Sequence, residues 1–311
     1  MSLIAVIDLG TNTFNLLIVE VHPDKSYQQI FQTKISVKLA EGGINKGFIA
    51  PVPFERGIDA LKIHKQTIEK YKADKILAFA TSAIRGASNG IDFVTKIKEE
   101  TNVDVEIISG DREAELIYYG VRSAVKMDDQ TSLIIDIGGG STEFIIADKE
   151  KIFWKQSFLL GAARLLEKFV PSDPIREDEI KTIKEYLNKE LQPLFEAVKK
   201  YPIMELIGSS GSFDSLAEMI AHKFYTPEIL DNKTEYTFNL DDCAVVYELI
   251  LKSTNAERME MKGLVAMRVD MIVISSILVH FIISSLDIRK MRLSTYSLKE
   301  GVLYEVLNEQ L

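Results

Sequence analysis

Three consecutive glycines between two carboxylates form the stretch of this sequence whose residue types most clearly suggest chemistry. The stretch reads LIIDIGGGSTEFIIA, and its candidate residues are Asp136, Gly138, Gly139, Gly140, Ser141, Thr142 and Glu143. Glycine has no Cβ, so successive backbone amides can surround an anion, and the two hydroxyls add donors. A phosphate is the expected ligand, and the carboxylates would place a divalent cation or an attacking water beside it. A purely structural glycine hairpin is the alternative.

The same arrangement occurs a second time, 128 residues earlier in the chain. In DLGTNTFNLLI the corresponding residues are Asp8, Gly10, Thr11, Asn12 and Thr13. A repeat at this distance predicts two similar domains whose hairpins line one cleft, because the repeats of a solenoid recur every 20 to 50 residues or so. The alternative is that the two glycine hairpins are unrelated and look alike only by chance, in which case they would not line one cleft together.

Strands and helices alternate around these hairpins, which predicts an α/β fold. Apolar runs predict strands at 3–7, 14–21, 30–39, 75–80, 103–108, 203–207 and 291–293. Helical periodicity and capping signals predict helices at 54–71, 91–100, 112–125, 177–191, 194–200, 213–222, 268–285 and 298–307, and another that is capped by Asp241 or Asp242 and runs to Lys252. The polar stretch 126–130 is the predicted boundary between a first domain, 1–126, and a second, 127–311, whose terminal helix could pack back on the first.

Four further candidates lie outside the hairpins. Arg85, in ATSAIRG, could clamp a phosphate with two hydrogen bonds or form a surface ion pair. Glu113, at the start of a helix, could be a capping carboxylate or a general base that takes a proton from water. Arg268 could line the cleft or pair with Asp270. A glycine-serine turn between a strand and a helix could hold a phosphate or nucleotide, and consists of Gly208, Ser209, Ser210, Gly211 and Ser212.

Composition narrows the class of protein. The 311 residues are 46% hydrophobic and 27% charged, as in ordinary globular proteins. The net charge of -9 and a pI near 5.2 argue against DNA or RNA as a partner. One cysteine, Cys243, allows no internal disulfide and makes the cytoplasm the expected compartment. The uncharged stretch 271–286 is too short for a membrane helix and is expected to be buried, in the core or at a homodimer interface.

Taken together, these motifs resemble the exopolyphosphatase / guanosine pentaphosphate phosphohydrolase (Ppx/GppA) family in its short, two-domain form. The segments that carry the resemblance are DLGTNTFNLLI, ATSAIRGASNG, ISGDREAELIYYGV, IDIGGGSTEF, GSSGSFDSLAEM and ERMEMKGLVAMRVDMI. The resemblance implies two ribonuclease-H-like domains of the actin / sugar kinase / heat-shock ATPase superfold on either side of a cleft.

The resemblance also implies roles for individual residues. Glu113 corresponds to the general base, and Asp8, Asp136 and Glu143 to carboxylates that place Mg²⁺ (or Mn²⁺) and water. The two glycine turns correspond to phosphate loops, Arg85 to a phosphate ligand, and 208–212 with Arg268 to a nucleotide-binding or substrate-binding segment.

The expected function is hydrolysis of the terminal phosphate of polyphosphate or guanosine pentaphosphate. Two alternatives stay open at this point. One is an ATP-dependent kinase of the same superfold acting on a small metabolite. The other is a non-catalytic sensor that binds guanosine tetra- or pentaphosphate.

Overall fold

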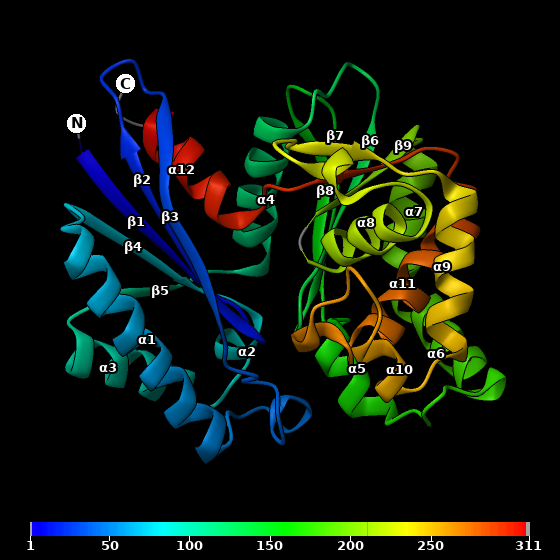
Figure 1. Ribbon diagram of the computed structural model, residues 1–311, viewed down its shortest axis with the longest axis horizontal. Helices are drawn as coiled ribbons and strands as arrows, with labels where there is room; N and C mark the ends of the chain where they lie inside the picture. Colours follow the sequence, from blue (N-terminus) through cyan, green and yellow to red (C-terminus); the bar gives the residue numbers. More distant parts are fainter. Residues whose placement is uncertain (1, 210, 309–311) are drawn as a thin grey trace.

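Two mixed β-sheets, each with its own helices, form two lobes that face each other (Figure 1). The computed structural model describes residues 2–209 and 211–308. The first sheet has the order β3-β2-β1-β4-β5 and the second the order β10-β11-β9-β6-β7-β8. Their strands are β1 Ser2–Leu9, β2 Thr13–Val21, β3 Tyr27–Ser36, β4 Lys75–Ala80, β5 Val105–Ile107, β6 Ser132–Ile137, β7 Thr142–Ala147, β8 Ile152–Phe158, β9 Glu205–Ser209, β10 Glu235–Thr237 and β11 Met291–Ser294.

The predicted internal repeat is confirmed by strand pairing. In the first lobe β1 and β2 are antiparallel, and Asp8 pairs with Asn15; in the second, β6 and β7 are antiparallel, and Asp136 pairs with Glu143. Both hairpins then run parallel to the next strand of the sheet, β4 and β9 respectively. The order 3-2-1-4-5 therefore occurs twice, which is the ribonuclease-H-like arrangement. The predicted α/β class is confirmed; the division at residue 126 stays a prediction.

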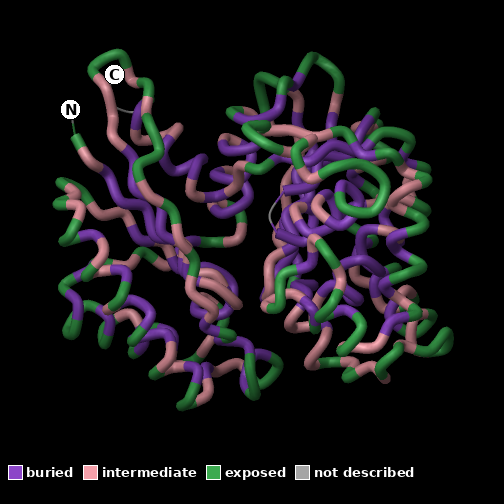
Figure 2. Tube along the Cα trace, viewed as in Figure 1, coloured by how far each residue is buried: buried purple, intermediate pink, exposed green. Residues whose placement is uncertain are grey.

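The helices α1 (Pro51–Tyr71) and α3 (Gly90–Thr101) cover one face of the first sheet. Alternate residues of β1 divide between its two faces: Ala5 and Ile7 pack toward these helices, whereas Ile4 and Val6 pack into the core between the lobes. Because both faces are covered, β1 is an almost continuous apolar run. Figure 2 shows this central strand buried along most of its length.

His64 on α1 is a fully buried titratable group in this core. Its Nε2 lies 3.1 Å from the backbone oxygen of Phe14, and its Nδ1 has no hydrogen-bond partner among the described residues. Burial lowers the pKa of His64, although the hydrogen bond to Phe14 opposes this shift. The folded protein therefore holds a neutral imidazole at pH values where the unfolded chain is already protonated.

Because the pKa of His64 is lowered in the folded protein, this residue should make the free energy of unfolding depend on pH. The substitution His64→Gln should remove that contribution. The stabilisation is present above the unfolded pKa of 6.5 and is lost as pH falls through the lower folded pKa. Between about pH 6.5 and about pH 5, the wild type should lose up to about 2 kcal/mol more unfolding free energy than the variant, whose amide can still donate to Phe14. Urea unfolding of both proteins across this range measures the difference, and equal slopes would show that His64 titrates normally.

The second lobe carries most of the remaining helices around one core. Their bounds are α5 Ala162–Phe169, α6 Glu177–Glu190, α7 Gln192–Lys200, α8 Gly211–Phe224, α9 Leu240–Lys252, α10 Asn255–Met259 and α11 Ile272–Ser285. The predicted helix 268–285 begins at Ile272, four residues later than expected, because Ala266–Arg268 forms a separate 3-10 turn. Strands β8 and β10 and helix α5 were not predicted. The part of the chain that is described contains no helix long and apolar enough to cross a membrane.

Two helices far apart in the sequence, α4 (Gly110–Ala124) and α12 (Leu298–Asn308), lie between the lobes (Figure 1). Both contribute to a core that also includes Ile4 of the first sheet and Ile134 of the second. The helices cross closely where Gly120 and Gly301 meet: a Cβ on Gly301 would lie 1.8 Å from the backbone oxygen of Leu116. The terminal helix thus returns to contact α4 and β1.

Candidate active site

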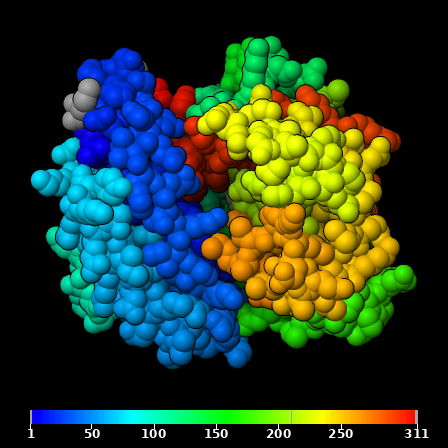
Figure 3. Space-filling model, viewed as in Figure 1, coloured from blue at the N-terminus to red at the C-terminus, as the bar shows by residue number. Residues whose placement is uncertain are grey.

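A cavity of about 240 Å³ lies between the lobes, at the point where the two hairpins turn. Most of the predicted site residues line it. From the hairpins these are Asp8, Gly10, Thr11, Asn12, Thr13, Asp136, Gly138, Gly139, Gly140 and Ser141, and from other elements Glu113, Gly211, Ser212 and Arg268. Figure 3 shows the hollow between the blue first lobe and the yellow and orange second lobe. Segments more than 250 residues apart in the sequence thus meet at one site.

The glycines allow the two loops to touch each other as well as to bind a ligand. A Cβ on Gly139 would lie 2.2 Å from Asn12 Nδ2, and one on Gly140 would lie 2.6 Å from Thr11 Oγ1. Real Cβ atoms do not approach other atoms so closely, so these positions require glycine while the loops keep this separation. The close approach brings the backbone amides and hydroxyls of both loops to one small volume, which suits the oxygens of a single phosphate group.

Each of the three carboxylates of the hairpins is held by a neutral side-chain donor. Asn15 Nδ2 donates to Asp8 Oδ2 at 2.9 Å, and Ser157 Oγ donates to Glu143 Oε1 at 2.6 Å. Asp136 Oδ2 accepts from Ser297 Oγ at 2.5 Å and from Ser209 Oγ at 3.2 Å. These bonds orient the carboxylates without neutralising them, so a cluster of negative charge is concentrated at the cavity.

Burial raises the pKa values of these acids. Burial raises the pKa of Asp8 to about 6, although the hydrogen bond from Asn15 opposes the shift. Burial, together with the charge of Asp136, raises the pKa of Glu143 to about 7. The pKa of Glu113 lies well above its usual range, chiefly because of burial and then because of the nearby Glu143. Such raised values indicate a site that favours binding of positive charge, either as protons or as a cation.

Glu113 is anchored by Arg85. Ser109 caps α4 by accepting a hydrogen bond from the backbone amide of Arg112, and this cap sets Glu113 in the first turn of the helix. Arg85 Nη1 donates to Glu113 Oε2 at 2.8 Å and to the backbone oxygen of Ile108 at 3.0 Å. The guanidinium lowers the pKa of Glu113 against the effect of burial. Glu113 therefore presents an oriented carboxyl group to the cavity.

Some predicted residues lie outside the lining of the cavity. Arg85 binds Glu113 in this structure, so its direct contact with phosphate stays a prediction. Thr142 and Glu143 are buried within the hairpin, and Thr142 Oγ1 donates to the backbone oxygen of Leu160. Gly208 and Ser209 are buried in β9, while Ser210 lies outside the described residues. Of the glycine-serine turn, the last two residues reach the cavity.

The structure adds residues to the site that sequence reasoning missed. Ser82 Oγ is buried, lines the cavity and has no hydrogen-bond partner among residues 2–209 and 211–308. Lys34, Asp214 and Lys299 also line it. Burial lowers the pKa of Lys299, but Glu300, Asp8 and Asp214 outweigh this effect and raise it, so the ammonium is retained. In the sequence Lys34 belongs to an ordinary alternating strand and Lys299 to an ordinary helix start, which gave no signal of a site. Ser82 and Asp214 lie within segments that carry the family resemblance, ATSAIRGASNG and GSSGSFDSLAEM, but were not singled out.

The expected pairing of Arg268 with Asp270 is wrong. Asp270 Oδ1 accepts from Asn255 Nδ2 at 2.8 Å, and its other oxygen lies 3.9 Å from Lys38 Nζ of the first lobe. Arg268 instead points into the cavity and packs on Gly211, where a Cβ would lie 1.2 Å from its Nη2. Burial lowers the pKa of Arg268, and Asp214 and Asp136 oppose that shift. The side chains of Arg268 and Asp270 point in different directions because the segment that carries them is irregular.

No group of three His, Cys, Asp or Glu side chains among the described residues is arranged to hold a metal ion on its own. Mg²⁺ is commonly held by one or two carboxylates together with substrate phosphates and waters. Asp8 and Asp136, which both line the cavity, fit this kind of site. Glu143 does not line it and is expected to act through water or through its neighbour Asp136.

Two ribonuclease-H-like sheets that bring two glycine turns and a buried carboxyl group to one cleft have the architecture of the actin-like superfold. The chain belongs to the Ppx/GppA phosphatase family, whose model matches residues 17–310. The resemblance inferred from the sequence motifs is therefore confirmed.

Known proteins support this assignment. The chain is 27% identical to exopolyphosphatase 1 of Mycobacterium tuberculosis over 315 residues, covering 99% of this chain and 89% of that protein. It is 31% identical over 281 residues to the bifunctional 3-dehydroquinate synthase/phosphatase of Fusobacterium nucleatum, covering 86% of this chain but spanning only 41% of that relative.

Solved structures show the same architecture. The crystal structure of an exopolyphosphatase from Cytophaga hutchinsonii is 40% identical, with a TM-score of 0.94 and coverage of 99% of this chain and 98% of that one. The Aquifex aeolicus member of the Ppx/GppA family is 26% identical, with a TM-score of 0.81 and coverage of 100% and 99%.

Proposed function

We propose that this chain removes the terminal phosphate of inorganic polyphosphate, of guanosine pentaphosphate or of both, by attack of water on phosphorus. The observation that carries the proposal is the meeting of two glycine loops and Glu113 in one cavity. The loops supply donors for phosphate oxygens and the glutamate supplies a proton acceptor. Membership of the Ppx/GppA phosphatase family and similarity to exopolyphosphatases support this choice.

Substrate binding depends on neutral and positively charged donors in the cavity. The loop amides and the hydroxyls of Thr11, Ser141 and Ser82 would bind the oxygens of the terminal phosphate; that of Ser82 has no partner among the described residues. Arg268 and Lys299 would offset the negative charge of that phosphate and of the next one along the chain. These local cations are needed because the whole protein carries a net charge of -9.

In this proposal Glu113 holds and deprotonates the attacking water. Its raised pKa makes it a better proton acceptor than an ordinary carboxylate, because a base works best when its pKa lies close to the working pH. Arg85 fixes one oxygen of the carboxyl group, which leaves the other oxygen to face the cavity. Phosphoryl transfer depends mainly on such positioning and on stabilisation of charge.

Mg²⁺ or Mn²⁺, when bound with the substrate, would neutralise phosphate charge and favour departure of the shortened chain. Asp8 and Asp136 are the proposed direct ligands, and Asn15, Ser209 and Ser297 orient them. Glu143 adds negative charge next to Asp136. The chemistry of these groups suits a hard, oxygen-preferring cation.

A second cavity favours guanosine pentaphosphate as one of the substrates. It measures about 470 Å³ and shares Lys34, Asp214, Arg268 and Thr295 with the first. Three basic and three acidic residues line it, together with apolar and aromatic ones; these are Lys34, Lys233, Arg268, Asp214, Glu218, Glu235, Leu230, Tyr236, Leu264, Val265 and Leu293. A cavity of balanced charge suits a nucleoside better than further phosphates, because it offers apolar surface for a base and acceptors for hydroxyl and amino groups.

A phosphate-release assay tests the proposal. Polyphosphate and guanosine pentaphosphate are each incubated with the protein and Mg²⁺, and parallel samples contain a chelator. We expect orthophosphate from at least one substrate without any acceptor, loss of release with the chelator, and recovery with Mg²⁺ or Mn²⁺. Transfer of the phosphate to an added metabolite without release of orthophosphate would identify a kinase, and tight nucleotide binding without release would identify a sensor; either result contradicts the proposal.

A further inference from the structure

The segment Arg268–Met271 connects the cavity to the opposite lobe. Arg268 and Met271 line the cavity. Asn12 Nδ2, on the phosphate loop of the first lobe, lies 2.9 Å from Met271 Sδ, and Lys38 Nζ lies 3.9 Å from Asp270 Oδ2. The segment 268–271 of the second lobe thus includes a cavity-lining cation, Arg268, and faces the first lobe. Their backbone position affects both the substrate-binding surface and the contact between the lobes.

The side chain of Arg268 is not held by its own polar contacts. Within the described parts of the chain, 2–209 and 211–308, its guanidinium makes no hydrogen bond and no ion pair. It rests on Gly211, which has no side chain to fix it. The charges of Asp214 and Asp136 attract the guanidinium but form no directed bond to it, so its direction is set mainly by packing and by the backbone that carries it. The position of Arg268 therefore depends on what fixes the backbone next to it.

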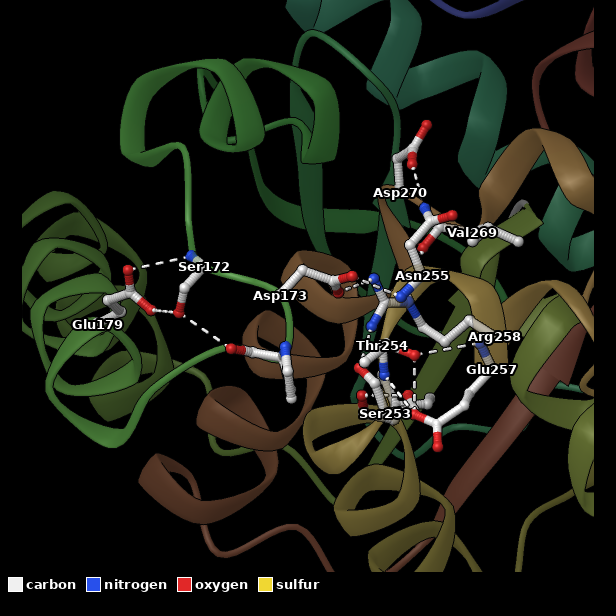
Figure 4. A network of polar contacts seen from close by, with 12 residues as sticks. Ser172, Asp173, Glu179, Ser253, Thr254, Asn255, Glu257, Arg258, Val269 and Asp270 are labelled. Atoms are coloured by element: carbon white, nitrogen blue, oxygen red, sulfur yellow. Dashed lines mark hydrogen bonds and ion pairs between the residues drawn. The ribbon is translucent and has the colours of Figure 1, made fainter.

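Arg258 fixes that backbone. It is 4% exposed, and its three guanidinium nitrogens bind three different segments (Figure 4). Nε donates to the backbone oxygen of Val269 at 3.1 Å, Nη2 donates to Asp173 Oδ1 at 2.8 Å, and Nη1 donates to the backbone oxygen of Ser253. A planar, rigid guanidinium can hold three acceptors in fixed directions, which the single ammonium of lysine cannot reproduce.

The same network also fixes the next residue of the segment. Asp173, which binds Arg258 through one oxygen, accepts the backbone amide of Asn255 through the other at 2.6 Å. The side chain of Asn255 then donates to Asp270 at 2.8 Å. Val269 and Asp270, the two residues that follow Arg268, are thus both held by one network centred on Arg258 (Figure 4).

We propose that Arg258 is a positioning residue for substrate binding: it sets the backbone of 268–271 so that Arg268 projects into the cavity. Arg258 itself lies outside the lining of the cavity, so its proposed role is indirect. The inference rests on the proposed contact between Arg268 and substrate phosphate. It assigns a functional role to a buried arginine that would otherwise be regarded only as part of the core.

A double-mutant cycle separates this role from a merely structural one. The variants are Arg258→Lys, Arg268→Gln and the double variant, and the readouts are KM and kcat for phosphate release from the better substrate. If Arg258 acts through Arg268, each single variant raises KM about tenfold, and the double variant has the KM of Arg268→Gln alone. Arg289→Lys is the matched control, because Arg289 is exposed and pairs only with Asp287 among the described residues; its KM should not change.

Folding is measured separately for each variant, and all assays are made well below the lowest midpoint of thermal unfolding. Asp173→Asn provides a second, milder variant that weakens the network while retaining Arg258. It should raise KM less than Arg258→Lys and likewise have no further effect in the Arg268→Gln background.

Independent effects would overturn the inference: if the KM increases of Arg258→Lys and Arg268→Gln multiply, Arg258 does not act through Arg268. An unchanged KM in well-folded Arg258→Lys and Asp173→Asn would also overturn it. If Arg268→Gln alone leaves KM unchanged, the proposed substrate contact of Arg268 fails and the inference fails with it. Continued release of orthophosphate in that variant would leave the proposed hydrolase function intact.

Discussion

Glu113→Gln is expected to lower kcat for phosphate release by about a thousandfold while substrate binding persists. An amide has nearly the same size as the carboxyl group and can still accept the hydrogen bond that Arg85 donates at 2.8 Å. It cannot take a proton from water at neutral pH. The substitution therefore removes the proton acceptor at this position and preserves the geometry of the side chain.

Glu115→Gln is the control for this experiment. Glu115 lies two residues along the same helix, is half-buried and pairs with Arg112 and Lys155. It does not line the cavity, so its substitution should leave kcat within about twofold of the wild type. The amount of bound, unreacted substrate is measured in both variants by equilibrium dialysis. Near-normal turnover in a folded Glu113→Gln protein would exclude Glu113 as the base.

Gly301→Ala is expected to lower the free energy of unfolding by about 3 kcal/mol or more, which is a larger loss than for His64→Gln or Gly57→Ala. Ala is favoured over Gly within a helix by about 1 kcal/mol, so propensity alone predicts stabilisation. Packing opposes this gain, because the added Cβ would lie 1.8 Å from the backbone oxygen of Leu116. Relief of that clash requires α4 and α12 to separate, and the same movement would displace Glu113 at the start of α4.

Gly57→Ala is the matched comparison in a helix of the first lobe. There the added Cβ would meet the ring of Phe93 at 2.6 Å, and a side chain can shift more easily than a backbone. We expect a net cost of about 1 kcal/mol, and chemical denaturation of both variants measures the difference. Equal costs for the two substitutions would show that the α4–α12 contact is not as tight as the structure indicates.

The role of Glu113 as a base rests on the family resemblance and stays a prediction, but the hairpins and their repeat could be predicted from the sequence alone. The reason is that these features are local: a glycine turn between two apolar runs specifies a hairpin, and the offset between Asp8 and Asp136 specifies its repetition. The pairing of Asn15 with Asp8 and of Glu143 with Asp136 confirms that correspondence to the residue.

Other parts of the site could not be predicted, because they depend on contacts between distant segments. Lys299 reaches the cavity only because the terminal helix returns to the first lobe. Ser297 binds Asp136 across 161 residues of sequence. Arg85 makes a contact that the sequence did not indicate, since its partner Glu113 comes from a different helix. Strand β10 was missed because it has only three residues and lies at the edge of its sheet.

Isotope labelling tests the central claim most directly, because attack by water leaves an oxygen of that water in the product. The protein is incubated with its substrate and Mg²⁺ in ¹⁸O-enriched water, and the released orthophosphate is analysed by mass spectrometry after a single turnover. The account predicts one ¹⁸O atom in each orthophosphate molecule, with no other phosphorylated product. Unlabelled orthophosphate, or transfer of the phosphate to an added acceptor, would contradict it.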